Sequence, residues 1–381
     1  MGGTDGGTAT PTRNQTTAAG GAVDGGSAGG QPTELGGFAQ RPGVVLGGSS
    51  HCSCSRISCA GPPNAGGRHR TGMNGPGEQS AADRTVTART VSRLFDRATV
   101  VDVALLLAVP AVLLAVASLP LPVRRALVFE YAAPSVGTAI ASPFVHLDGS
   151  HLQRNLLAYG VLAPTGYALS VASGHRQRFR VVFVSLVLVC PPALSYLNLA
   201  IVREGVSVGF SGVAMALFGY LPLAIAAHLD RRFDVAPTHA TAPLLFFLGL
   251  QLITVLTLGA VATNRVSVPV RGVTVPVTSV LVASLIGLVA ALTLVLVLYT
   301  LAVRDHVTAL TTALRTTTTR PGHFELFVLA TGLFLAVPFV TFPIDPIVGD
   351  GVLNLYVHLV GYALGFIGSF TLVSIEERLS A

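Results

Sequence analysis

Three groups of polar residues interrupt the apolar runs of this 381-residue sequence. The first group contains His146, His151 and Asn155, the second Ser211 and the third His358. A polar side chain inside a membrane helix is costly, so each one is a candidate functional residue. A serine hydroxyl becomes a good nucleophile when a nearby histidine takes its proton, and N–H donors stabilise the oxyanion that forms. These residue types therefore predict acyl-transfer chemistry.

Each of these residues has an expected role in that chemistry. Ser211 is the expected nucleophile and His358 the expected general base. His151 and Asn155 are four residues apart, so they project from one helical face and are the expected oxyanion donors, together with the serine backbone amide. No acidic residue lies at matching depth in these helices, and a buried carboxylate would be expensive there. The sequence therefore favours a dyad over a triad.

Glycines flank both expected catalytic residues. Gly209 and Gly212 allow a tight turn and a close backbone approach around the nucleophile. Gly361 and Gly365 have the small-xxx-small spacing that lets membrane helices pack closely. Gly361 follows the histidine by three residues, on about the same helical face. A close helix contact at Gly361 would therefore deliver the base to the nucleophile.

The elements that must position these residues are membrane helices. Hydrophobic residues make up 51% of the chain and charged residues only 11%, and the mean hydropathy is +0.66. Eight apolar runs are long enough to cross about 30 Å of hydrocarbon. They lie near residues 100–121, 150–170, 181–200, 211–228, 242–263, 279–303, 324–343 and 351–374. The sequence predicts an all-α polytopic membrane bundle over residues 98–374.

The placement of arginines predicts the orientation of this bundle. The connections after the second, fourth and sixth runs hold eight arginines, and the opposite connections hold five. Both termini, including the short segment 375–381, are therefore expected in the cytoplasm, in a multi-pass protein of the cell membrane. The expected nucleophile, base and oxyanion donors then all lie toward the outer leaflet.

Residues 1–97 form a polar tail rich in Gly, Ser and Thr, which we expect to be disordered because it cannot bury enough apolar surface. Residues 1–30 lack the apolar stretch of a secretory signal. The three cysteines within residues 51–59 could hold zinc with a neighbouring histidine, but their spacing favours incidental thiols. Nine tail arginines against six acidic residues are too dilute for nucleic-acid binding. No cofactor, metal or nucleic-acid partner is expected.

The three polar groups resemble the three signature motifs of the rhomboid intramembrane serine proteases. They occur in the family's order, on helices of the right polarity, over roughly residues 98–374. The motifs are His146-x4-His151-x3-Asn155, Gly209-Phe-Ser211-Gly212 and His358-x2-Gly361-x3-Gly365. The resemblance implies a Ser211–His358 dyad, oxyanion stabilisation by His151 and Asn155, and a supporting role for His146. It also implies that water reaches the site from the outer face and that the substrates are single-span proteins with an unstable helix.

The sequence departs from the family pattern in three places. Two more crossings separate the nucleophile from the base than in a six-helix core, so 242–263 and 279–303 are interpreted as an inserted hairpin that preserves helix polarity. Met215 stands four residues after the nucleophile, where many relatives carry a tyrosine that packs on the histidine. The chain has no tryptophan, so the Trp-Arg pair often found in the first loop is missing beside Arg124 and Arg125.

Two other functions fit parts of the pattern. A catalytically inactive relative would bind membrane clients without cutting them, but the presence of both Ser211 and His358 argues against it. A transporter is suggested by the eight crossings, but the halves show no obvious repeat and the polar cluster lies toward one leaflet. Singly, each motif also has a structural interpretation, such as a helix N-cap for Ser211. The favoured function is an intramembrane serine endopeptidase whose partners are transmembrane substrates and the lipid bilayer, in an oligomeric state that the sequence does not specify.

Overall fold

The computed structural model describes a large part of the membrane region. The described residues are 99–201, 205–234, 237–264, 267–270, 273–304, 322–345, 347–348 and 351–380. The chain divides into residues 1–70 and residues 71–381, and every described residue belongs to the second unit. The expected tail over residues 1–97, with its three cysteines, lies outside the described residues.

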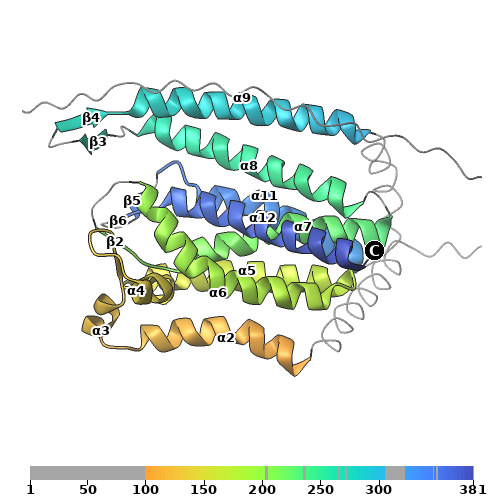
Figure 1. The fold of residues 1–381 in the computed structure, drawn as a ribbon, viewed down its shortest axis with the longest axis horizontal. Helices are drawn as coiled ribbons and strands as arrows, with labels where there is room; N and C mark the ends of the chain where they lie inside the picture. Colours follow the sequence, from red (N-terminus) through yellow and green to blue (C-terminus); the bar gives the residue numbers. More distant parts are fainter. Residues whose placement is uncertain are drawn as a thin grey trace, which may run out of the picture. The chain divides into compact units, whose positions relative to one another are not determined.

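The described residues form eight long helices at the places where the apolar runs predict them (Figure 1). The helices are α2 (Val100–Ala117), α5 (Gly149–Ala172), α6 (Arg176–Leu197), α7 (Ser211–Phe233), α8 (Thr238–Thr263), α9 (Thr278–Ala302), α11 (His323–Thr341) and α12 (Leu355–Ser380). The expected all-α polytopic bundle is therefore confirmed.

Seven of these helices, all except α5, are long and apolar enough to cross a membrane. The chain is thus a multi-pass membrane protein. The first turns of α5 carry His151, Gln153, Arg154 and Asn155, which lower its hydropathy. Its crossing therefore remains a prediction, as do the cell-membrane location and the orientation.

Local sequence explains where three of the helices begin. Thr99 and Asp102 form a reciprocal capping box at the start of α2. The Asp148 carboxylate accepts a hydrogen bond from the His151 backbone N–H at 2.8 Å and so caps α5. Gly209 has a φ of 101°, a left-handed conformation that glycine adopts without strain. This turn leads directly into α7, which begins at the expected nucleophile.

The centre of the bundle is α7, in which residues 212–229 are all buried. It contacts α5, α6, α8, α11 and α12. These five helices also contact one another in the order α5, α6, α12, α8, α11 and back to α5. They therefore form a closed ring around α7. Outside the ring, α9 packs on α8 and α2 packs on α5, at opposite sides of the bundle (Figure 1).

Short elements connect the long helices, and hydropathy alone did not predict them. Between α2 and α5 lie α3 (Leu121–Ala126), β1 (Phe129–Glu130), α4 (Val136–Ala141) and η1 (Ser142–Phe144). Three more connections contain η2 (Asn198–Ala200) with β2 (Val206–Ser207), the hairpin β3 (Ser267–Val270) and β4 (Val273–Pro276), and the hairpin β5 (Ile347–Val348) and β6 (Gly351–Val352). The antiparallel pairing of Phe129 with Ser207 fixes the first loop to the segment before α7.

An ionic cluster marks the end of the bundle where α2 and α6 begin and α12 ends. The Asp102 side chain is 1% exposed and accepts hydrogen bonds from Arg180 Nε at 2.6 Å and from the Tyr167 hydroxyl at 3.0 Å. Arg178 Nε donates to Glu376 at 3.2 Å. This arginine-rich end lies opposite the starts of α5, α7 and α12, which carry the candidate site residues.

We expect Asp102→Asn to lower the free energy of unfolding by about 2–3 kcal/mol, because the substitution removes charge-assisted hydrogen bonds and leaves Arg180 without its counter-ion. Thermal unfolding in detergent micelles measures this loss. The matched control is Glu376→Gln, whose side chain is 54% exposed and whose ion pair is worth at most about 1 kcal/mol. Equal shifts in the two variants would contradict an anchoring role for Asp102.

Candidate functional site

The starts of α7 and α12 touch through their backbones, beside Ser211 and His358. A Cβ on Gly361 would overlap the carbonyl oxygen of Gly212, and a Cβ on Gly212 would lie 2.5 Å from Val357 Cγ1. Ser211 directly precedes one side of this contact, and His358 lies between Val357 and Gly361 on the other. The structure therefore brings together the two helix starts that carry the expected nucleophile and base.

His358 is buried in a setting that defines its protonated nitrogen. Its side chain is 2% exposed, and Nδ1 lies 2.9 Å from the carbonyl oxygen of Thr341, at the end of α11. Because a carbonyl only accepts hydrogen bonds, Nδ1 carries the proton and the neutral ring keeps a lone pair on Nε2. Within the described part of the chain, Nε2 has no hydrogen-bond partner. A histidine in this tautomer can act as a general base through Nε2.

Ser211 is half-buried at the first position of α7. Among the described residues, no hydrogen bond joins its hydroxyl to His358 Nε2. Hydrogen bonds between catalytic groups are often long in the absence of substrate and tighten when it binds. The arrangement thus supplies a hydroxyl and an unengaged basic nitrogen on two helices in contact.

His151 and Asn155 lie against the turn that precedes Ser211. A Cβ on Gly209 would overlap the His151 ring, lie 2.7 Å from its Nε2 and lie 3.4 Å from Asn155 Nδ2. Both expected oxyanion donors therefore reach the same turn from one face of α5, as their four-residue spacing predicts. The Gly209 N–H donates to the Ser142 carbonyl at 3.1 Å, which holds the turn against η1.

His146 supports Asn155 by accepting a hydrogen bond from Asn155 Nδ2 at His146 Nε2, at 2.7 Å. Burial, followed by the charge of His151, lowers the pKa of His146 to about 4, so the ring is neutral near pH 7 and Nε2 is able to accept. Arg124 Nη1 donates to the His146 carbonyl at 2.7 Å. An amide nitrogen has two hydrogens, so Asn155 keeps a second N–H for another acceptor.

Met215 packs between α7 and α12. Met215 is 1% exposed, and its Cβ would lie 3.2 Å from a Cβ on Gly361, so it fills the contact between α7 and α12. The ring that packs on His358 comes from Phe342, whose centroid lies 5.8 Å away in an edge-on arrangement. Sequence reasoning missed Phe342 and the Thr341 carbonyl, and the only signal was their place at the end of an apolar run.

A second polar cluster, also missed from the sequence, holds the start of α12. Asn354 Nδ2 donates to Asn198 Oδ1 at 3.0 Å, and Asn354 Oδ1 accepts from the Val357 N–H at 3.2 Å. Asn198 Nδ2 donates in turn to the Tyr131 hydroxyl at 2.7 Å. These bonds tie the end of α6 to the turn that carries His358. The signal in the sequence that could have indicated this cluster is the position of Asn198 and Asn354 at the boundaries of apolar runs.

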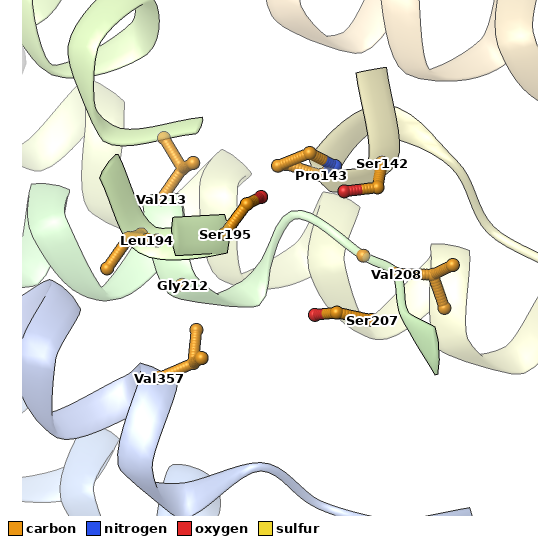
Figure 2. A pocket seen from close by; sticks show the side chains of 10 residues that line it. Ser142, Pro143, Leu194, Ser195, Ser207, Val208, Gly212, Val213 and Val357 are labelled. Atoms are coloured by element: carbon orange, nitrogen blue, oxygen red, sulfur yellow. The ribbon is translucent and has the colours of Figure 1, made fainter. Parts of the chain in front are cut away.

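A small pocket opens beside the start of α7, and Ser211 is not among its lining residues (Figure 2). Gly209, Gly212 and Val357 line it, together with hydroxyl-bearing side chains such as Ser195. Its volume of about 20 Å³ is enough for one water molecule. Hydroxyl and backbone groups in its wall are suitable hydrogen-bond partners for that water. Among the described residues, no group of three or more His, Cys, Asp or Glu side chains could hold a metal ion.

Comparison with known proteins gives no match for this chain. No family model, no curated protein and no solved structure matches it. A functional assignment therefore rests on the chain's own motifs and on the geometry described above.

Proposed function

We propose that this chain is a rhomboid-type intramembrane serine endopeptidase that cuts transmembrane protein substrates. The observation that carries the proposal is the buried His358, with Nδ1 bonded to a carbonyl and Nε2 free, on a helix in backbone contact with the helix that begins at Ser211. Unpartnered ring nitrogens also occur in His146, His175 and His228 among the described residues, so what distinguishes His358 is its place on the helix that contacts the start of α7.

In the proposed reaction, His358 Nε2 takes the proton of the Ser211 hydroxyl while Oγ attacks the scissile carbonyl carbon. The resulting imidazolium is stabilised by the Thr341 carbonyl, which accepts from Nδ1 where a triad would use a carboxylate. The tetrahedral intermediate then expels the amine, which takes the proton from Nε2, and leaves an acyl group on Ser211. Water activated by the same nitrogen hydrolyses the ester and regenerates the serine.

The oxyanion of that intermediate needs donors close to Ser211. The second N–H of Asn155, a protonated Nε2 of His151 and the Ser211 backbone amide are suitable groups. The pocket lined by Gly209 and Gly212 gives room for one water near the start of α7. Donors from α5, nucleophile from α7 and base from α12 thus converge on one end of the bundle.

Asn155→Ala is expected to lower the turnover number about 10²-fold or less, because it removes one oxyanion donor among several. Initial rates of cleavage of a transmembrane substrate in proteoliposomes measure the effect. Gln153→Ala, at an exposed position on the same helix, is the control and should keep the full rate. A rate for Asn155→Ala equal to that of the control would limit Asn155 to helix packing.

A fluorophosphonate probe tests the proposal directly. Activated Ser211 Oγ is expected to displace fluoride and form a stable phosphonyl ester, which mass spectrometry locates on one peptide. Labelling should disappear in Ser211→Ala and in His358→Ala. It should persist in Ser195→Ala, because the hydroxyl of Ser195 is buried and already donates to the Ala139 carbonyl at 2.9 Å. Labelling of another serine, or of none, would overturn the nucleophile assignment.

A further inference from the structure

Helix α8, which the sequence suggested was part of an inserted hairpin, is wedged between α11 and α12. The three helices meet at Gly249 of α8. A Cβ there would overlap the hydroxyl of Tyr362, on α12, and lie 2.9 Å from Phe334 Cζ, on α11. Only glycine leaves room for both rings, so this residue determines how closely α8 packs against α11 and α12.

Tyr362 of α12 packs against α8 and forms a hydrogen bond to it. It is completely buried, and its hydroxyl donates to the Phe246 carbonyl of α8 at 3.0 Å. Its ring stacks on Phe246, with centroids 5.3 Å apart, and packs on Phe218 of α7 at 5.1 Å. A hydrogen bond in such an apolar setting has no water to compete with it. The contact therefore fixes both the depth and the rotation of α12.

Helix α8 packs against both α12, which carries His358, and α11, which supplies its hydrogen-bond acceptor. Tyr362 lies four residues after His358, one helical turn along the same face of α12. Phe334 lies on α11, the helix whose last residue, Thr341, accepts from His358 Nδ1. A shift of α8 would therefore move the helix that carries the base, the carbonyl that orients it, or both.

We propose that α8 is a positioning element for the general base, acting through Gly249 and Tyr362. The proposal rests on the proposed function and extends it to a helix that carries none of the motif residues. The packing of α8 between α11 and α12 sets the distance between these two helices. At this distance His358 Nδ1 donates to the Thr341 carbonyl, and Nε2 remains free for Ser211. Helix α8 is in this respect part of the proposed catalytic scaffold.

A double-mutant cycle tests this role. In Gly249→Ala the new methyl group displaces Tyr362, and we expect the turnover number to fall about 10²-fold with little change in KM, the size of effect that a small misplacement of catalytic groups produces. In Tyr362→Phe we expect a fall of about 10-fold. The double variant removes the hydroxyl that the methyl group would strike, so it should regain about 10-fold over Gly249→Ala. Gly259→Ala, on the same helix with open space around it, is the matched control and should keep the full rate.

The readouts separate positioning from folding and from the proposed function. Thermal unfolding gives the folded fraction of each variant. The rate of fluorophosphonate labelling at Ser211 is then expressed per folded molecule. Full labelling in Gly249→Ala, or strictly additive losses in the double variant, would overturn the positioning role while the protease assignment stands. A wild-type protein that neither labels at Ser211 nor cleaves would overturn the proposed function, and this role of α8 with it.

Discussion

Ser211→Ala is expected to reduce cleavage of a transmembrane substrate to the background rate, a loss of about 10⁴-fold or more, and His358→Ala is expected to lose as much. The losses should be equal because the two side chains of the proposed dyad would act as one unit: a hydroxyl without a base is a poor nucleophile, and a base without the hydroxyl has no nucleophile to activate. For the same reason, the double variant should be no slower than either single variant. The measurement is product formation in proteoliposomes of reconstituted protein.

Two control variants separate chemistry from folding in this test. Ser170→Ala removes another buried hydroxyl, at the end of α5 away from His151, and His228→Ala removes another fully buried histidine, at the opposite end of α7. Both should retain the full turnover number per folded molecule, although His228→Ala is expected to be less stable because it leaves a cavity. Substantial residual cleavage in His358→Ala would remove the base from the mechanism.

The same experiment discriminates the two other functions that the sequence left open. A wild-type chain that binds transmembrane clients without cutting any of them would be an inactive relative. Solute or ion flux that survives Ser211→Ala would instead indicate a transporter. The feature that favours cleavage over both is the position of His358 on a helix in backbone contact with the helix that begins at Ser211.

The helices and the order of the site residues were predictable because they follow from local physical rules. A run of about 20 apolar residues has few alternatives to a membrane helix, and all eight predicted runs contain helices close to their expected bounds. The four-residue spacing of His151 and Asn155 placed both on one face, and both indeed contact Gly209. The glycine spacing at Gly361 and Gly365 likewise predicted a close helix contact, which the structure shows.

The groups that contact and orient His358 were not predictable, because they come from other helices and one of them is a backbone carbonyl. The acceptor for His358 Nδ1 is a carbonyl group, which every residue has, so the identity of Thr341 carries no signal. Phe342 replaces the aromatic contact that Met215 lacks, but it comes from a different helix. The position of α8 between α11 and α12 depends on the packing of whole helices, which apolar periodicity does not encode.

The close contact between α7 and α12 leads to the second large expected effect. A Cβ on Gly365 would overlap the carbonyl oxygen of Ala216 and lie 2.6 Å from its carbonyl carbon. These are backbone atoms of the central helix, so they cannot yield as a flexible side chain would. Gly365→Ala should force the two helices apart and lower the free energy of unfolding by about 3 kcal/mol, as overpacking of a filled core does. Separation of the helices also moves His358 from Ser211, so we expect the folded fraction to label with fluorophosphonate at least about 10²-fold more slowly.

Gly368→Ala provides the matched control for Gly365→Ala, because it lies one turn further along α12 with nothing within 4 Å of its Cβ. Alanine is favoured over glycine in a helix by up to about 1 kcal/mol, so this variant should be as stable as the wild type or slightly more stable. Thermal unfolding and the labelling rate at Ser211 are compared for the two variants in the same detergent. If Gly365→Ala unfolded and labelled like Gly368→Ala, α7 and α12 would not be held in backbone contact in the working protein. The close contact of these two helices could then not be what brings His358 to Ser211.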